Sequence, residues 1–500
     1  MSLPPKLPLL SLSATLLTLL TVHADWRTDV GWDMLQLYAG ASIPTGNGIT
    51  LEMAEAGSNY MPNTGHSAFS GITFTNISNT SSATSSHATT VGLNFYGSST
   101  SLLTGTNIVR VRSADDFINN FLNTSGTVGS SSAAVMSHAY VGAANPSQEA
   151  ALNKIITRFD FFCQNSNVIN VVGMNNGSSG TIPPLFGSSY NSISVGRTDG
   201  LHSHGSTPAN YPGPGRQKPE IVSVASVNAT SYATGAVSSA VSLLYAKANL
   251  SGNINATHPD TIKACLIAGA TKEEFPNWAQ AEDKPLDATY GAGELNIFHS
   301  YRIVEQSESS PGIVNFRGWS KKSATATYSF TTPDYISPMT ISAALIWQRS
   351  VSKSGGGPST SYSYQALADL RLELLNQSGM PIQTSDSSLD NIEHIWNNQL
   401  EPNTQYSLKV TNSSGTDFSL AWRVNGMATA DITALASGNN IDVSLGSLIV
   451  SVPYIIQRST DLSNWSDVHN FTATGSTLDW TDTSAPTGSR VFYRLFFIEP

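Results

Sequence analysis

Four residues, Glu55, His87, Asn175 and Ser231, have the chemical types that nucleophilic attack on a carbonyl group requires. A serine hydroxyl becomes nucleophilic when a histidine accepts its proton and a carboxylate orients that histidine. An amide side chain can donate a hydrogen bond to the oxyanion that forms, which contributes about 10²–10³ in turnover. Each residue also has an ordinary interpretation: Ser231 as the cap of a helix, His87 as a neighbour of a helix start, and the other two as turn residues.

The segments around these four residues alternate between strands and helices. Apolar and β-branched segments predict strands at residues 49–57, 133–140, 168–173, 191–196 and 220–225. A helix is predicted at residues 148–164, where apolar side chains recur at helical spacing, and a helix of small residues begins near Ser231. This alternation predicts an α/β fold, with a parallel sheet and helices on both of its faces. Because chemistry collects at the carboxyl ends of parallel strands, Glu55, Asn175 and Ser231 are expected at one edge.

Six short segments strengthen the chemical interpretation. They are residues 46–57 (GNGITLEMAEAG), 87–92 (HATTVG), 172–177 (VGMNNG), 218–222 (KPEIV), 230–237 (TSYATGAV) and 290–296 (YGAGELN). In this order and spacing they resemble the patterns of the subtilisin-like serine peptidases, or subtilases. Those patterns are G-x-G-V-x-V-A-V-I-D-T-G, H-G-T-H-V-A, A-A-G-N-x-G, K-P-D-V-V, T-S-M-A-S-P-H-V and Y-G-x-G-x-V-N. The resemblance covers roughly residues 46–303 and implies a subtilisin-like fold for that part of the chain.

The resemblance also implies a role for each of the four residues. Ser231 takes the place of the nucleophile and His87 that of the general base and acid. Glu55 takes the place of the carboxylate that orients His87. Asn175, together with the backbone N–H of Ser231, takes the place of the oxyanion donors.

A substrate-binding segment is implied as well. Residues 135–142 match the family's substrate-binding strand and loop, which makes Tyr140, Val141 and Gly142 the candidate substrate-binding residues. Simple core packing is an equally good interpretation of Tyr140.

Three positions depart from the family patterns. Glu55 stands in place of an aspartate, Thr90 in place of the second histidine, and Gly235 in place of the proline after the serine. Only the glutamate bears on the chemistry, because its carboxylate lies about one bond (~1.5 Å) further from the backbone. Glutamate does serve in triads generally. Only residues 25–47 separate Ala24 from Gly48 of the first motif, so we expect no inhibitory prodomain.

The N-terminus predicts export from the cell. Lys6 precedes an apolar segment at residues 7–22, and Val22-His23-Ala24 fits the small-x-small cleavage rule. Residues 1–24 are therefore expected to be a signal peptide and the protein to be secreted. No later segment approaches the ~20 apolar residues of a membrane span. The net charge of −10 and the lack of basic runs argue against nucleic acid as a partner.

No cofactor is expected for the catalytic chemistry. His202 and His204 lie in a Gly/Ser/Pro-rich loop, which favours exposure to solvent over metal binding. No Asp-x-Asp-x-Asp-Gly calcium loop is present, although the family often binds structural calcium through irregular loops, so a calcium site stays open. Cys163 and Cys265 can be either a disulfide or two buried thiols, and the sequence does not separate these alternatives.

Beyond the α/β part, alternating strands predict two all-β modules. A β-sandwich is expected at residues 309–428, and its segments resemble jelly-roll sandwiches of secreted bacterial peptidases. Residues 354–363 are rich in Gly and Ser and predict a flexible loop within it. Residues 429–500 resemble a fibronectin-like module. The peptidase-like domain is then expected at residues 25–308.

Two hypotheses about function follow. The first is a secreted, monomeric serine endopeptidase that cleaves protein or peptide substrates through an acyl-enzyme on Ser231, with a Ser-His-Glu triad and an asparagine oxyanion donor. The second is a catalytically degenerate protein of the same fold that acts as an extracellular binding or scaffold module. A non-peptidase esterase is disfavoured because the chain lacks a Gly-x-Ser-x-Gly elbow around Ser231.

Overall fold

The computed structural model describes residues 25–123, 125–142, 146–178, 180–332, 339–426, 431–446, 448, 453–461, 465–487 and 490–497. The predicted signal peptide, residues 1–24, lies outside these residues.

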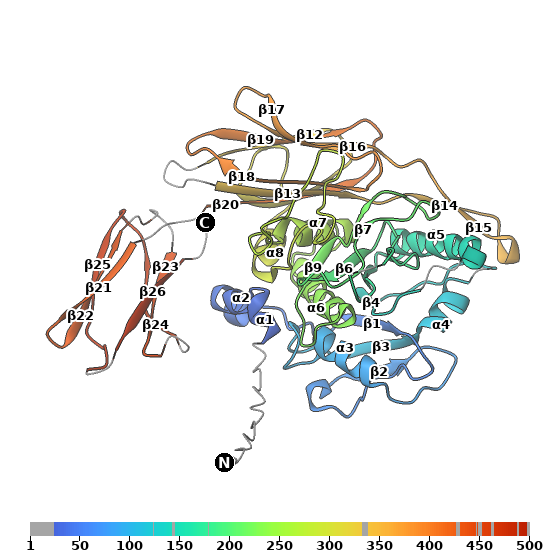
Figure 1. Ribbon diagram of the computed structural model, residues 1–500, viewed down its shortest axis with the longest axis horizontal. Helices are drawn as coiled ribbons and strands as arrows, with labels where there is room; N and C mark the ends of the chain where they lie inside the picture. The colour runs from blue at the N-terminus through green and yellow to red at the C-terminus, as the bar shows by residue number, and fades with distance from the viewer. Residues whose placement is uncertain are drawn as a thin grey trace, which may run out of the picture.

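A seven-stranded parallel sheet forms the centre of the N-terminal part, in the order β2-β3-β1-β4-β5-β6-β9 (Figure 1). Its strands are β1 (Thr50–Glu55), β2 (Thr73–Asn76), β3 (Ile108–Ser113), β4 (Val135–His138), β5 (Ile169–Gly173), β6 (Ile193–Arg197) and β9 (Ile221–Ser223). Between β6 and β9 in the sequence, the strands β7 (Gly205–Ser206) and β8 (Gln217–Lys218) pair antiparallel as a short separate ribbon. The predicted α/β fold with a parallel sheet is confirmed.

Helices cover both faces of this sheet. The helices are α1 (Trp26–Asp29), α2 (Trp32–Ala39), α3 (Ser86–Tyr96), α4 (Ala114–Asp116), α5 (Glu149–Ser166), α6 (Thr230–Asn249), α7 (Pro259–Gly269) and α8 (Ile297–Val304). Val171 belongs to the apolar cluster of α6, whereas the adjacent Val172 belongs to the cluster of α5. Because successive side chains of a strand point to opposite faces, α5 and α6 lie on opposite sides of β5.

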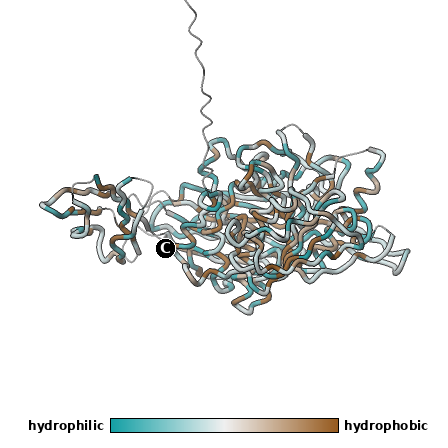
Figure 2. The backbone as a smooth tube through the Cα atoms, turned by 90° about the horizontal axis from the view of Figure 1, so that it is seen from below, coloured by the Kyte–Doolittle hydropathy of each residue, from teal (hydrophilic) through white to brown (hydrophobic). Residues whose placement is uncertain are grey.

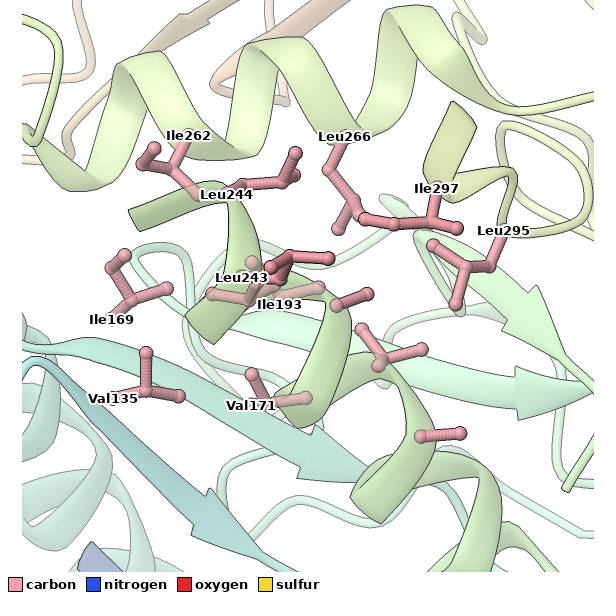
Figure 3. Packing of buried hydrophobic residues seen from close by; sticks show 14 of the residues in the cluster. Val135, Ile169, Val171, Ile193, Leu243, Leu244, Ile262, Leu266, Leu295 and Ile297 are labelled. Atoms are coloured by element: carbon pink, nitrogen blue, oxygen red, sulfur yellow. The ribbon is translucent and has the colours of Figure 1, made fainter. Parts of the chain in front are cut away.

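The largest core lies between the sheet, α6 and α7 (Figure 3). Val135, Ile169 and Val171 rise from the sheet toward Leu243 and Leu244 of α6. The small residues of α6 let it pack closely. A Cβ on Gly235 would lie 2.8 Å from the Val91 carbonyl oxygen of α3. Gly235, which stands where the family pattern has a proline, therefore lies where α3 and α6 approach each other closely. These two helices carry His87 and Ser231.

The first segment that the structure describes is helical but broken. Residues 26–39 form two helices, α1 and α2, that are separated at Gly31. Gly31 has φ +81°, a left-handed conformation that glycine adopts without strain. The break allows Trp26 and Trp32 both to be buried.

A two-sheet β structure follows the α/β part. One sheet has the order β10-β12-β19-β16-β17 and the other β11-β20-β13-β18. The strands are β10 (Gly312–Ile313), β11 (Arg317–Lys322), β12 (Ala326–Thr331), β13 (Met339–Trp347), β16 (Leu370–Leu375), β17 (Pro381–Ser385), β18 (Ile392–Leu400), β19 (Gln405–Asn412) and β20 (Phe418–Gly426). The sheets share one apolar core that includes Tyr328, Leu372 and Trp422. Against α7, Thr261 Oγ1 lies 2.9 Å from Ser419 Oγ of β20.

The Gly/Ser-rich segment predicted as a flexible loop is part of a hairpin. Strands β14 (Val351–Ser354) and β15 (Ser361–Tyr364) pair antiparallel, with residues 355–360 as their turn. This hairpin leaves the sandwich and lies against α5 of the α/β part (Figure 1). The loop prediction was wrong for residues 354 and 361–363, which lie in paired strands, because contacts with a distant helix hold this hairpin in place.

The C-terminal region consists of two three-stranded antiparallel sheets, in the orders β21-β22-β25 and β24-β23-β26. Their strands are β21 (Asp431–Ser437), β22 (Asn440–Gly446), β23 (Pro453–Ser459), β24 (Ser466–Thr472), β25 (Leu478–Asp482) and β26 (Phe492–Phe497). The prediction of all-β structure after the α/β part is thus confirmed.

Hydrophobic chain segments gather inside the larger body (Figure 2). Both cysteines, Cys163 and Cys265, lie in this interior as free thiols. Burial raises the pKa of both thiols, so each stays protonated. Among the described residues, the search for a helix long and apolar enough to cross a membrane finds none.

Candidate active site

Glu55 ends strand β1 at the carboxyl edge of the central sheet. Its side chain is only 2% exposed, and its Oε2 lies 2.8 Å from Nδ1 of His87. Its other oxygen, Oε1, is buried without a hydrogen-bond partner among the described residues. The longer side chain of glutamate therefore reaches the histidine, at the cost of one unsatisfied carboxylate oxygen.

His87 lies in the first turn of α3, which begins after the cap residue Ser85. The side chain of His87 is 42% exposed, so one ring nitrogen contacts the buried carboxylate while the ring remains accessible. The Tyr232 ring lies beside it, with a centroid separation of 5.8 Å. This arrangement orients the imidazole from two sides.

The pKa values of this pair shift for different reasons. The hydrogen bond to Glu55 raises the pKa of His87, and burial opposes that effect. Burial raises the pKa of Glu55, because the pull of His87 does not fully offset the loss of solvation. The geometry supports an ionised Glu55 that accepts the Nδ1–H of His87, which leaves Nε2 of the ring without a proton when the imidazole is neutral.

Ser231 lies in the first turn of α6, and it is not the cap of that helix. Ala229 occupies the cap position, and Ser231 Oγ donates to the carbonyl of Ala139 at 3.3 Å. The structure contains no hydrogen bond between Ser231 and His87. Catalytic hydrogen bonds are often long without substrate and tighten on binding. The backbone N–H of Ser231 has no acceptor among the residues that the structure describes, so it is available to a developing oxyanion.

Two adjacent asparagines follow β5, and the structure distinguishes them. Both asparagines are exposed, and the side chain of Asn175, the predicted oxyanion donor, forms no hydrogen bond with any described residue. Asn176 Oδ1 accepts from the backbone N–H of Thr230 at 2.9 Å and from Thr230 Oγ1 at 3.2 Å. The amide of Asn176 is thereby tied to the residue before Ser231, a contact that the sequence motif did not indicate.

The predicted substrate-binding residues lie just beyond β4. The Tyr140 hydroxyl is 3.1 Å from Nδ1 of His138, and Val141 is 38% exposed. Gly142 forms an isolated antiparallel bridge with Leu185, and a Cβ on Gly142 would lie 2.6 Å from that leucine's Cβ. The carbonyl of Ala139 accepts a hydrogen bond from Ser231, so the segment 140–142 begins directly after a residue that contacts the candidate nucleophile.

The paired histidines of the polar loop are not both in solvent. His202 is fully buried, its Nδ1 accepts from the Arg197 N–H at 3.1 Å, and its Nε2 lies 2.9 Å from the Thr289 carbonyl. The expectation of solvent exposure was wrong for this residue, because its ring contacts both the end of β6 at Arg197 and the loop that contains Thr289. Among the described residues, no cluster of three or more His, Cys, Asp or Glu side chains is placed to hold a metal ion.

Comparisons with known proteins give distant structural likenesses. No family model matches the chain, and no curated protein sequence matches it. The structure of the MycP3 protease from the type VII (ESX-3) secretion system is similar with a TM-score of 0.32 and 13% identity, over 56% of this chain and 88% of that one. Tripeptidyl peptidase 2 gives a TM-score of 0.30 and 9% identity, over 82% of this chain and 51% of that one. A β-1,2-glucanase from Parabacteroides distasonis gives a TM-score of 0.16 and 13% identity, over 37% of this chain and 31% of that one. Likenesses this weak carry no argument about function, which rests on the residues of the site.

Proposed function

We propose that this chain is a secreted serine endopeptidase of the subtilisin-like type, which hydrolyses peptide bonds through an acyl-enzyme on Ser231. The observation that carries this proposal is the 2.8 Å contact between the buried Glu55 carboxylate and Nδ1 of His87. A buried carboxylate that orients a half-exposed histidine is the arrangement that serine activation needs. The motif order and the position of Ser231 at a helix start support the same conclusion.

In the proposed reaction, Glu55 holds the His87 ring so that Nε2 accepts the proton of the Ser231 hydroxyl. The serine oxygen then forms a bond to the scissile carbonyl carbon, and the carbonyl oxygen becomes an oxyanion. Protonated His87 gives its proton to the leaving amine as the C–N bond breaks. Water, deprotonated by the same histidine, then releases the acyl group from Ser231. The negative charge of Glu55 stabilises His87 while it is protonated.

For the oxyanion donor, we propose the 175–176 asparagine pair, and we favour Asn176 over the predicted Asn175. Because Thr230 fixes Asn176 Oδ1, its Nδ2 group can be directed at an oxygen near Ser231 at little entropic cost. The N–H of Ser231 is the second donor.

Substituting aspartate for each asparagine tests which of the two is the oxyanion donor. Asn176→Asp keeps an acceptor for the Thr230 N–H but removes the Nδ2 donor, so we expect kcat to fall by about 10²–10³. Asn175→Asp, the matched control, adds the same charge one residue away and is expected to cost less. Steady-state kinetics on a peptide substrate measure both effects, and a larger loss in Asn175→Asp would return the role to Asn175.

The raised pKa of His87 predicts the pH dependence of activity. Protonated His87 cannot accept the serine proton, so kcat/KM should rise with pH through the pKa of this residue. Because the Glu55 hydrogen bond raises that pKa, the acid limb should lie above the ordinary histidine value of about 6.5. In Glu55→Gln the residual activity should show this limb at lower pH. A limb that stays in place would show that Glu55 does not set the pKa of His87.

A fluorophosphonate probe tests the proposed function directly. An active protein should be labelled on the peptide that contains Ser231, and it should cleave denatured casein. A wild-type protein that does neither, although folded, would support the alternative, a catalytically degenerate binding or scaffold protein. The unsatisfied Glu55 Oε1 is the feature that favours this alternative.

The remaining predictions complete the proposal. We propose the division into residues 25–308, 309–428 and 429–500, with a jelly-roll-like sandwich and a fibronectin-like module after the peptidase domain. Tyr140, Val141 and Gly142 would bind a protein or peptide substrate, and the enzyme would act as a monomer outside the cell after removal of residues 1–24.

A further inference from the structure

The hairpin β14–β15 makes a buried polar contact with the α/β part. The Tyr364 hydroxyl of β15 donates to Oδ2 of Asp160 on α5 at 2.6 Å. Asp160 is fully buried, and its hydrogen-bond partners are neutral groups. Since a buried carboxylate is costly unless hydrogen-bonded, the tyrosine of the sandwich contributes to keeping this charge inside the α/β part.

The other donors to Asp160 come from one loop. The N–H groups of Tyr190 and Asn191 donate to its carboxylate at 3.1 and 2.9 Å, and so does the Ser189 hydroxyl. The Asp160 side chain thus joins the hairpin to residues 189–191. Burial and the neighbouring carboxylate hold the pKa of Tyr364 well above its ordinary value, so the phenol remains a donor.

Further contacts hold the hairpin in place along α5. The Tyr362 hydroxyl accepts from the Val128 N–H at 2.9 Å, and the Arg158 guanidinium lies 4.5 Å from the centre of the Tyr362 ring. The Val351 N–H donates to Gln164 Oε1 at 2.7 Å. The hairpin is therefore attached at both strands and does not rest on a single side chain.

The loop that Asp160 binds is continuous with residues 185 and 186, which lie beside the candidate substrate segment 140–142. The Ser189 N–H donates to the Phe186 carbonyl at 2.9 Å. The Phe186 ring is stacked on Phe159 of α5 at 3.9 Å and lies 6.1 Å from the Tyr140 ring. Leu185, the residue before it, forms the bridge with Gly142. Residues 185–191 therefore run from the Asp160 contact to both ends of the segment 140–142.

We propose that the β14–β15 hairpin is a positioning element of the substrate site, in which Tyr364, through Asp160, holds the loop 185–191 against the segment 140–142. This inference rests on the proposed function. In this arrangement the hairpin acts on the segment 140–142 through the loop 185–191. Tyr364 touches neither the substrate nor the triad, so it should affect substrate binding and leave the chemistry at Ser231 unchanged.

The test compares two variants that each remove one hydrogen-bonded tyrosine hydroxyl, one from the hairpin and one from the sandwich. Tyr364→Phe removes the donor to Asp160 and keeps the ring. Tyr328→Phe, the matched control, removes a hydroxyl that donates to Ser320 Oγ at 2.9 Å inside the sandwich. Kinetics on an extended peptide, the rate of fluorophosphonate labelling of Ser231, and hydrogen exchange of the amides of residues 189–191 are measured for both variants and the wild type.

We expect Tyr364→Phe to raise KM by about tenfold with kcat and the labelling rate within about twofold of wild type, since the lost hydrogen bond is to a charged group. Amide hydrogen exchange at residues 189–191 should accelerate by a similar factor. Tyr328→Phe should change neither KM nor this exchange rate. Asp160→Asn combined with Tyr364→Phe should add little to the effect of Asp160→Asn alone, because Asp160→Asn already removes the charge that the Tyr364 hydroxyl stabilises.

Two results would overturn the inference, and they are distinguishable. If the wild type is labelled while Tyr364→Phe matches Tyr328→Phe in KM and exchange, the hairpin does not position the site, and the proposed function stands. If the folded wild type is neither labelled nor active on peptides, the proposed function fails, and the positioning role fails with it.

Discussion

Replacing Ser231 with alanine is expected to abolish fluorophosphonate labelling and to lower kcat for peptide hydrolysis by about 10⁶, the effect of removing the nucleophile of a serine peptidase triad. The hydroxyl contributes only a 3.3 Å hydrogen bond to the Ala139 carbonyl and does not cap α6. The variant should therefore fold with nearly unchanged stability, which places the loss in the chemistry.

A serine on the same helix provides the control for this prediction. Ser238 is buried in α6, and its hydroxyl donates to the Thr234 carbonyl at 2.7 Å. Ser238→Ala should keep labelling and turnover near wild type, with at most a small change in the thermal unfolding midpoint. Labelling that persists in Ser231→Ala, at a rate like that of Ser238→Ala, would assign the reactivity to another residue.

Glu55→Gln is expected to have the second largest effect, a fall in kcat of about 10⁴. Glutamine is the same size as glutamate, so the contact with His87 can persist. Its amide can donate to Nδ1, which would stabilise the tautomer with the proton on Nε2, and that tautomer cannot accept the serine proton. The loss should appear in kcat with little change in KM, as measured by steady-state kinetics.

Glu55→Asp tests the geometry of the same contact. The shorter side chain withdraws the carboxylate by about 1.5 Å, enough to break a 2.8 Å hydrogen bond unless β1 or α3 moves. An activity between those of the wild type and Glu55→Gln is therefore expected. Wild-type kcat in both Glu55→Gln and Glu55→Ala would contradict the triad role of this residue.

Much of the fold could be predicted from residue patterns, because its signals are local. The apolar face of α5, with Ile155, Ile156 and Phe159 buried, follows from helical spacing. The β-branched residues of β5 and β6 predict strands that are buried on both faces. Strands β2 and β3 were not predicted. In β2, the edge strand, Phe74 is the one apolar residue, and in its neighbour β3 the apolar residues alternate with polar ones.

The features that were missed depend on distant parts of the chain. The Gly/Ser-rich segment indicated a flexible loop, yet Tyr362 within it and Tyr364 just after it are held by Arg158 and Asp160. No local pattern shows such a contact, because its partners are about two hundred residues apart. The burial of His202 was missed for the same reason. Its ring contacts the carbonyl of Thr289, which belongs to a different loop and is distant in the sequence.

The sequence by itself determined which residue types are available and their order, and so the kind of chemistry that Glu55, His87 and Ser231 can perform. Only the tertiary structure shows that the Glu55 carboxylate reaches His87, because this contact depends on how far β1 lies from α3. It also decided that Asn176, and not Asn175, is tied to the start of α6. Two neighbouring asparagines have the same chemistry in the sequence. They differ in the direction in which the folded backbone points each side chain.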